Sequence, residues 1–220
     1  MPRHILENDN FAYLTYALVL LLFVSALVDS LRIGFGSRVI EATVMLTLVA
    51  GIWSIRKQRR WFPTAVGLVA AIAVVLIGGL FLDLSGLYVT HLLILLCFVS
   101  LSAWVVAKQV LFAGRADANI VMGAICLYLL LGVIWAALYL LVDAAFPGSF
   151  SGPLSPEHRN NFPDLLYFSF TSLTTQGFGD FVPVLPLARF LVYVEGIFGQ
   201  LYIAIVIASL VGIRISSRRP

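Results

Sequence analysis

Long apolar runs separated by short polar segments dominate the chain. The runs are Phe11–Val28, Val39–Ile55, Trp61–Leu82, Leu84–Ala107, Ala118–Val142 and Leu187–Ile213. A helix needs about 20 mostly apolar residues to cross a bilayer. The pattern therefore predicts six transmembrane helices, of which the second is the shortest and carries Glu41 near its start. A shorter run from Phe162 to Thr174 fits a re-entrant helix between the last two spans.

The composition agrees with this pattern. Of the 220 residues, 61% are hydrophobic and 11% are charged, and the mean hydropathy is +1.01. Soluble domains carry about 25% charged residues, so the chain is expected to be an all-α integral membrane protein. Its net charge of +3 then reflects the topology of its loops rather than a nucleic-acid partner.

The basic residues predict the orientation, because cytoplasmic loops carry an excess of Lys and Arg. One side of the predicted membrane collects Arg3, Arg56, Lys57, Arg59, Arg60, Lys108, Arg115, Arg214, Arg218 and Arg219. The other side has only Arg32, Arg38, Arg159 and Arg189. Both termini are therefore expected in the cytoplasm, and we expect a bacterial inner membrane. The cluster Arg56, Lys57, Arg59 and Arg60 also suits anionic lipid heads, although a topology-setting loop explains it equally.

The most informative segment is Thr174–Asp180, which reads Thr-Thr-Gln-Gly-Phe-Gly-Asp. Glycine takes positive φ angles without steric cost, and here glycines alternate with larger residues. Such a backbone can aim successive carbonyl groups at one axis. A ring of carbonyl oxygens can replace the hydration shell of a monovalent cation.

With Tyr167–Leu173 before it, this segment resembles the pore helix and selectivity filter of the potassium-channel superfamily, whose usual filter is Thr-Val-Gly-Tyr-Gly-Asp. Gln176 stands in place of Val, and Phe178 in place of Tyr. The resemblance implies that the filter is Thr175–Gly179. Its K⁺ ligands would be the Thr175 hydroxyl and the carbonyls of Thr175, Gln176, Gly177 and Phe178. K⁺ would be the permeant ion, and no cofactor is implied.

One loop cannot surround an ion, so four copies are needed and a homotetramer is expected. The filter would be supported by Tyr167, Phe168, Thr171, Asp180 and Glu195. Of these, Tyr167 is expected to hydrogen-bond Asp180, and the two phenylalanines at 168 and 178 are expected to pack together. The Gln176 amide needs partners behind the filter, for which Thr171, Ser172 and Glu195 are candidates. Glu195 itself is a carboxylate within a span, where charge is costly and marks function or a structural hydrogen bond.

Counting forward from the filter, Gly199 matches the hinge glycine of the family's inner helix, although a glycine there also permits close helix packing. Ile203, Ile207 and Val211 recur every fourth residue. Four copies of this stripe would form a constriction that gates by dewetting. A stripe facing lipid or another helix is the alternative.

The chain divides into a four-helix portion, residues 1–108, and a pore portion, residues 109–220. The fourth span, Leu84–Ala107, contains no Arg or Lys. A voltage sensor carries three to four gating charges per subunit, so steep voltage gating is not expected.

No catalytic Ser/His/Asp set, phosphate-binding loop or metal-ligand cluster is present in the sequence, so an enzyme is not expected. The sequence predicts a passive, homotetrameric potassium channel. A nonselective monovalent cation channel and a non-conducting channel-like subunit are the alternatives. A secondary transporter fits less well, because no internal repeat is evident.

Overall fold

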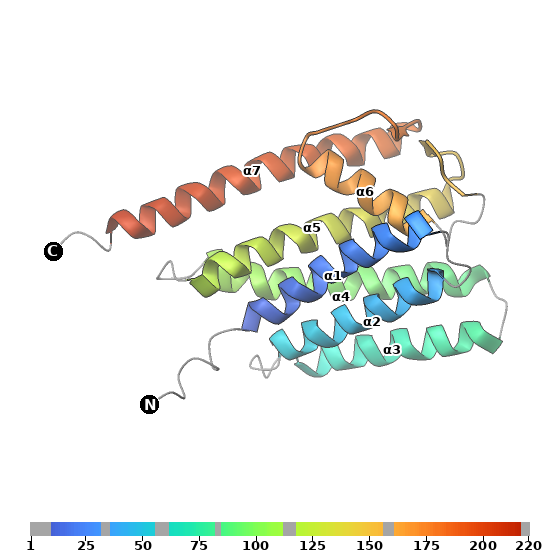
Figure 1. The fold of residues 1–220 in the computed structure, drawn as a ribbon, viewed down its shortest axis with the longest axis horizontal. Helices are drawn as coiled ribbons and strands as arrows, with labels where there is room; N and C mark the ends of the chain where they lie inside the picture. Colours follow the sequence, from blue (N-terminus) through green and yellow to red (C-terminus); the bar gives the residue numbers. More distant parts are fainter. Residues whose placement is uncertain are drawn as a thin grey trace.

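The computed structural model describes residues 10–31, 36–55, 62–81, 85–111, 118–155 and 161–216. Within them the chain is mostly helical, with one short antiparallel strand pair (Figure 1). The elements are α1 (Asn10–Leu31), α2 (Gly36–Ile55), α3 (Phe62–Phe81), α4 (Ser85–Leu111), α5 (Ala118–Ala145), β1 (Phe150–Ser151), α6 (Phe162–Leu173), β2 (Val182–Pro183) and α7 (Pro186–Ser216).

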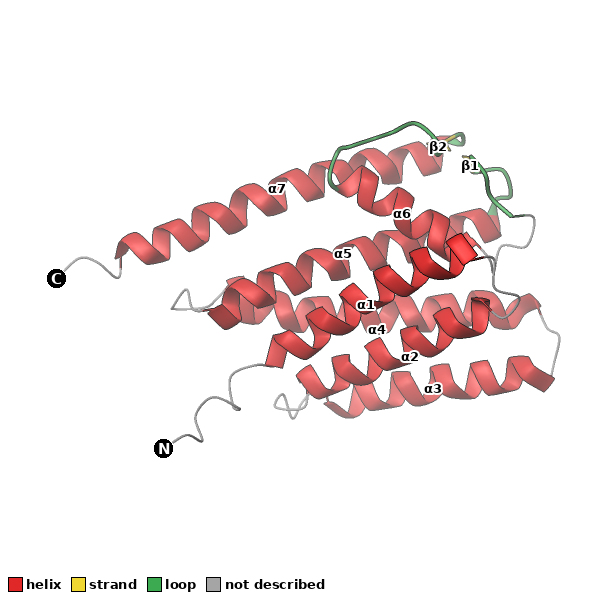
Figure 2. Ribbon diagram, viewed as in Figure 1, coloured by secondary structure: helices red, strands yellow, loops and turns green. Residues whose placement is uncertain are grey.

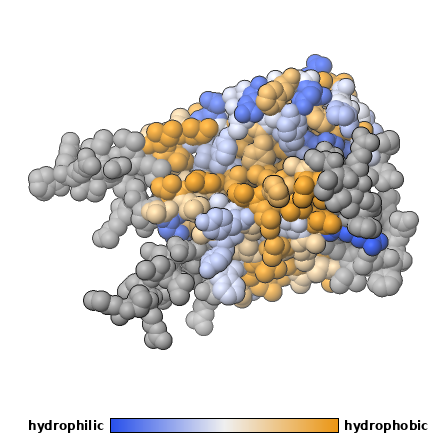
Figure 3. All heavy atoms as spheres, viewed as in Figure 1, coloured by the Kyte–Doolittle hydropathy of each residue, from blue (hydrophilic) through white to orange (hydrophobic). Residues whose placement is uncertain are grey.

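Each of the six predicted spans is a helix, and the predicted re-entrant segment is the short helix α6. Over the described side chains, four segments are long and apolar enough to cross a membrane. They are Phe11–Val28, Tyr88–Leu111, Ala118–Ala145 and Pro186–Ser209. Apolar side chains cover much of the middle of the molecular surface (Figure 3). The chain is therefore an integral membrane protein.

The helices are arranged in two portions that share α5. Helix α1 packs against α2 and α5, and α4 packs against α3 and α5. Helix α6 lies between α5 and α7 (Figure 1). The start of α1 and the end of α7 lie at the same end of the molecule, whereas the strands lie at the opposite end (Figure 1).

Polar side chains inside the apolar helices bond to their own backbone. The hydroxyl of Thr15 donates to the Phe11 carbonyl at 2.8 Å, and that of Thr47 donates to the Thr43 carbonyl at 2.9 Å. This pattern satisfies a hydroxyl one helical turn back, which matters because bilayer hydrocarbon offers no water to bond it.

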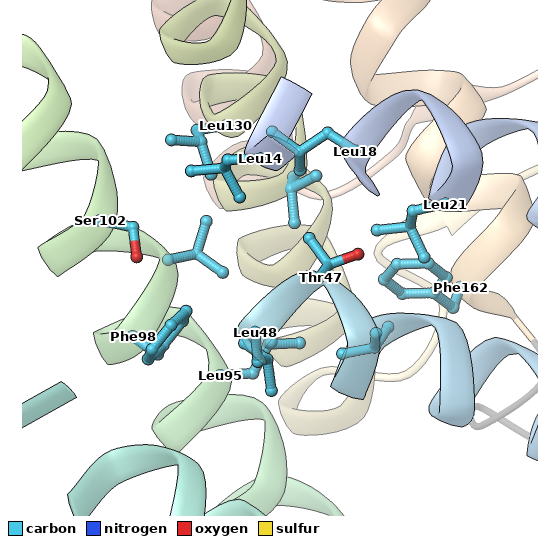
Figure 4. Close-up of a pocket in the computed structure, with 13 residues that line it drawn as sticks. Leu14, Leu18, Leu21, Thr47, Leu48, Leu95, Phe98, Ser102, Leu130 and Phe162 are labelled. Atoms are coloured by element: carbon cyan, nitrogen blue, oxygen red, sulfur yellow. The ribbon is translucent and has the colours of Figure 1, made fainter. Parts of the chain in front are cut away.

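A small apolar cavity lies in the four-helix portion (Figure 4). It is lined mainly by leucine, valine and phenylalanine side chains of α1, α2, α4 and α5, with Thr47 and Ser102 as the polar exceptions. Phe162, the first residue of α6, also lines it. Apolar cavities of this kind stay dry, so it is no ion path. It shows instead that the four-helix portion packs directly against the start of α6 in the same chain.

The sequence pattern does not reveal the two strands. They join the segment after α5 to the segment before α7. Phe150 pairs with Pro183 and Ser151 pairs with Val182 in antiparallel register (Figure 2). The amide of Val184 also donates to the Ser149 carbonyl at 2.8 Å. The end of the filter loop is thereby anchored to the segment that follows α5.

The first turn of α6 contains a proline and lacks a side-chain cap. Pro163 lies in its first turn, where a missing N–H costs nothing. Asn161 occupies the N-cap position but makes no capping hydrogen bond with its side chain. Its amide oxygen instead accepts from the Ser155 amide at 2.8 Å, and its amide nitrogen lies 3.4 Å from the Asp143 carboxylate. The side chain therefore ties the outer loop to α5 and leaves the helix end uncapped.

Candidate selectivity filter

Helix α6 determines where the candidate filter begins. One face of α6 is buried against α5 and α7, through Leu165, Leu166, Ser169 and Leu173 among others. After Leu173 the chain leaves the helix and runs as a loop back toward β2 (Figure 2). The last turn is closed by Thr174, whose amide and hydroxyl both donate to the Phe170 carbonyl, at 3.0 and 2.6 Å.

The loop backbone alternates in the way the glycine pattern predicts. Gly177 and Gly179 have φ angles of 53° and 82°, and Thr175 joins them at 60°. A threonine at positive φ is an outlier, because the branched side chain crowds the backbone there. Such a residue persists only where its surroundings hold it. Here the Thr175 amide donates to the Ser172 carbonyl at 2.9 Å.

The other anchor of the loop is the carbonyl oxygen of Thr171. It accepts from the amides of Gln176 and Gly177 at 2.8 and 3.3 Å. The amides of Gln176 and Gly177 are therefore bound to the last turn of α6. Among the described residues, no hydrogen bond uses the carbonyl oxygens of Thr175, Gln176, Gly177 or Phe178 as acceptor. Four consecutive carbonyls are thus left available to a cation or to water.

Glu195 of α7 lies behind this loop and is completely buried. Its carboxyl group accepts a hydrogen bond from the Tyr139 hydroxyl of α5, and its other oxygen lies 2.6 Å from the hydroxyl of Ser169 on α6. The Ser169 hydroxyl also lies 2.8 Å from the Gly132 carbonyl of α5. A buried polar cluster therefore joins the three helices of the pore portion.

Aromatic rings pack around the same place. The ring centroid of Phe168 lies 5.4 Å from that of Tyr139, 5.8 Å from that of Phe150 and 6.3 Å from that of Phe181. Centroid separations of 4.5–7 Å are typical of attractive aromatic pairs. The rings link α5, β1, α6 and Phe181, the residue before β2.

Two expectations about the filter's support can be compared directly with this geometry. A hydrogen bond to the Asp180 carboxylate raises the pKa of the Tyr167 phenol, since that bond favours the protonated hydroxyl; this contact was expected. The expectation that Phe178 packs against Phe168 is wrong within the chain. Phe178 is 68% exposed. The ring of Phe168 packs instead against the rings of Tyr139, Phe150 and Phe181.

The expectation that Gln176 hydrogen-bonds Thr171, Ser172 or Glu195 is also wrong within the chain. Its side chain is exposed and has no hydrogen-bond partner among the described residues. Both oxygens of Glu195 are taken by Tyr139 and Ser169, and the Thr171 hydroxyl donates to the Phe168 carbonyl at 2.9 Å. In the described part of the chain no hydrogen bond joins the Ser172 hydroxyl to Gln176 either, and the amide of Gln176 is exposed.

The expected gating residues all belong to α7. A Cβ atom added at Gly199 would lie 2.1 Å from the Leu173 carbonyl oxygen, so a close approach of α7 to α6 requires glycine there. α7 is helical through this position, and the hinge role stays a prediction. Ile203 and Ile207 are exposed. The side chain of Val211 lies outside the described residues, as does the basic cluster Arg56, Lys57, Arg59 and Arg60.

The roles of Tyr139, Ser169 and Gln200 were not predicted from the sequence. Glu195 did signal that buried partners must exist, because a carboxylate in a span needs them. Which tyrosine and which serine supply them depends on how α5, α6 and α7 pack, and spacing along the chain does not reveal it. In the described part of the chain, no group of three or more His, Cys, Asp or Glu side chains is placed to hold a metal ion.

Residues 123–213 match the model of a family described as ion channels. The match spans α5 to α7 with the loop between them, which is less than half of the chain. It confirms the resemblance to the potassium-channel superfamily for this part of the chain, which is similar to an ion channel domain. No curated protein and no solved structure matches the chain.

The buried cluster predicts how stability responds to changes at Glu195. Glu195→Leu removes the acceptor of the Tyr139 hydroxyl, and leaving a buried polar group unpaired costs about 1–3 kcal/mol. The midpoint of thermal unfolding in detergent should therefore fall. Glu195→Gln keeps an acceptor oxygen and should lower the midpoint less.

A second substitution makes this test specific. Tyr139→Phe should destabilise the wild-type protein but be neutral or stabilising in the Glu195→Leu background, since it removes the unpaired hydroxyl. Tyr16→Phe is the matched control, because Tyr16 is 66% exposed on α1, away from the cluster, and its replacement should leave the midpoint unchanged. Wild-type stability in Glu195→Leu would contradict the role given to the cluster.

Proposed function

We propose that the protein is a passive, potassium-selective channel. The observation that carries the proposal is the backbone of the loop Thr175–Gly179. Its φ angle is positive at every second residue, and its carbonyl oxygens accept no hydrogen bond among the described residues. Carbonyl oxygens in such a row are the ligands that replace the hydration shell of K⁺. The Thr175 hydroxyl completes the inner end of the filter. Tyr167, Phe168, Thr171, Asp180 and Glu195 support it.

The functional unit in this proposal is a homotetramer. One chain supplies one loop, which borders an ion on one side only. Helix α7 supports assembly, because only 11% of the most apolar 18-residue stretch of Pro186–Ser209 is buried within the chain, against 56% of the corresponding stretch of Ala118–Ala145. Large apolar side chains stand exposed along it: Leu187, Phe190, Tyr193, Ile197, Phe198, Leu201, Ile203, Ile205 and Ile207. Neighbouring subunits would cover part of this surface and the pore water would meet another part.

The topology we propose has six spans with both termini in the cytoplasm. Helices α2 and α3 have 20 residues each, which at 1.5 Å per residue gives about 30 Å, the thickness of the hydrocarbon core. The common end of α1 and α7 in Figure 1 supports the placement of both termini on one side. A bacterial inner membrane, and anionic lipid at the basic cluster of residues 56–60, belong to the same proposal.

Gating in this proposal takes place along α7. Exposed Ile203 and Ile207, continued by Val211, would form the apolar constriction from four subunits. Gly199 would serve as the hinge only if α7 can leave α6, because the present contact with Leu173 holds the two helices together.

The second candidate is a nonselective monovalent cation channel. The observation that favours it is the side chain of Gln176, which is exposed and finds no partner in the described part of the chain. An unbraced amide beside the filter permits the carbonyls to move. We favour potassium selectivity because the amides of Gln176 and Gly177 are themselves bound to Thr171.

The first test is ion flux. Liposomes containing the protein should take up Rb⁺, a permeant substitute for K⁺, and Gly177→Ala should abolish uptake. The φ angle of Gly177 is 53°, and an alanine in the left-handed region costs roughly 1–2 kcal/mol. Gly67→Ala is the control, since a Cβ atom at Gly67 would meet nothing within 4 Å. Normal Rb⁺ uptake by Gly177→Ala would contradict the assignment of Thr175–Gly179 as the filter.

The second test separates the two candidate functions. Under bi-ionic conditions with K⁺ and Na⁺, the wild-type reversal potential should show preference for K⁺. Gln176→Val should change the stability of the conducting state more than the reversal potential. Equal permeation of K⁺ and Na⁺ by the wild type, with K⁺ preference restored by Gln176→Val, would favour the nonselective channel.

The third test concerns voltage. Within α4 the sole Lys or Arg is Lys108, in the last turn, where its ammonium group lies 4.8 Å from the Trp104 ring centroid. A charge moved through the whole field contributes about 2.3 kcal/mol per 100 mV, and the apolar body of α4 carries none. Open probability should therefore change only weakly with voltage. A steep conductance–voltage curve with gating current would contradict this.

A further inference from the structure

The side chain of Gln200, which lies outside the candidate filter, contacts the first residue of that filter. The Gln200 side chain, on α7, is exposed, and its amide nitrogen lies 3.4 Å from the hydroxyl oxygen of Thr175. Nothing else in the described part of the chain hydrogen-bonds the Gln200 side chain. The contact joins the inner helix to the residue at which the filter begins.

The direction of this hydrogen bond follows from counting protons. The Thr175 hydroxyl has one proton and donates it to the Thr174 carbonyl at 2.7 Å. Its oxygen can then only accept from a neighbour. The Gln200 group that meets it must therefore be the NH₂, and the amide oxygen is left free. Because a hydroxyl oxygen has two lone pairs, one remains for an ion after the amide has bound the other.

The close approach of the two helices explains why Gln200 can reach. At Gly199, the neighbouring residue, an added Cβ would lie 2.1 Å from the Leu173 carbonyl oxygen, and at Gly196 one would lie 3.8 Å from the Ser172 carbonyl oxygen. The backbone of α7 thus lies directly against the last turn of α6. A residue larger than glycine at position 199 would push Gln200 away from Thr175.

From these contacts we infer that Gln200 is a positioning residue for the innermost ion site. Its amide holds the Thr175 hydroxyl in one orientation, with one lone pair available to the permeating cation. Thr175 needs such a restraint, since its backbone is in the left-handed region and its side chain is exposed. Functional groups held by a second set of hydrogen bonds bind better than groups free to rotate. This inference rests on the proposed channel function.

The test is the single-channel K⁺ conductance in planar bilayers, which does not depend on the number of channels present. Gln200→Leu should reduce it about two- to tenfold, the factor that corresponds to one net hydrogen bond. Gln200→Asn, whose amide is one methylene shorter and cannot reach Thr175, should reduce it similarly. Gln109→Leu is the matched control, because Gln109 lies on α4, away from the filter loop.

A double-mutant cycle tests whether Gln200 acts through Thr175. Thr175→Ala removes the hydroxyl, so Gln200→Leu should have no further effect on conductance in that background. Thr175→Ser keeps a hydroxyl, and the effect of Gln200→Leu should persist there. A merely structural role for Gln200 would not depend on the presence of that hydroxyl.

Each outcome of these experiments has a distinct meaning. Wild-type conductance in both Gln200→Leu and Gln200→Asn overturns the inference, as do effects that multiply independently in the Thr175→Ala background. If Gln200→Leu fails to assemble, the Gln200→Asn measurement decides alone. A wild-type protein that passes no K⁺ in bilayers overturns the proposed function itself, which separates that failure from failure of the inference.

Discussion

The buried carboxyl group of Glu195 is the interaction on which the pore portion depends. In an apolar surrounding this group is stable only with hydrogen-bond partners, and it has them on two other helices, at Tyr139 and Ser169. These contacts fix α5, α6 and α7 relative to one another. The position of α6 in turn places the Thr171 carbonyl, which binds the amides of Gln176 and Gly177. The backbone of the candidate filter is therefore connected to Glu195 through a short chain of contacts.

Two glycines allow these helices to come close enough for the contacts to form. Gly132 lies under the Phe170 ring, where an added Cβ would come within 2.4 Å, and Gly199 lies under the Leu173 carbonyl. Small residues at such positions are typical of helix packing in membranes, where dispersion and hydrogen bonds replace the hydrophobic effect between helices. The same close packing leaves the outer surface of α7 unburied within the chain, as the proposed tetramer requires.

The apolar pattern predicted the number and approximate positions of the helices, because the length of a span is set by the thickness of the bilayer. The alternation of Gly177 and Gly179 predicted positive φ angles at those residues, and both are found. The sequence did not predict the positive φ of Thr175, because threonine has no intrinsic preference for it and the contacts with α6 impose it. Likewise, Gln176 was expected behind the candidate filter, but its side chain is exposed, and the Glu195 carboxyl group is already bound to Tyr139 and Ser169, which are distant in sequence.

By itself the sequence determined that the chain resides in a membrane, that its helices follow in this order, and that a loop with glycines at positive φ lies between the last two. Those properties follow from local composition and from the conformational freedom of single residues. Only the tertiary structure decided that Tyr139 and Ser169 share Glu195, that Phe168 packs against Phe150 and Phe181, and that Gln200 reaches Thr175. Each of these contacts joins residues on different elements, and its existence depends on side-chain packing that no local pattern encodes.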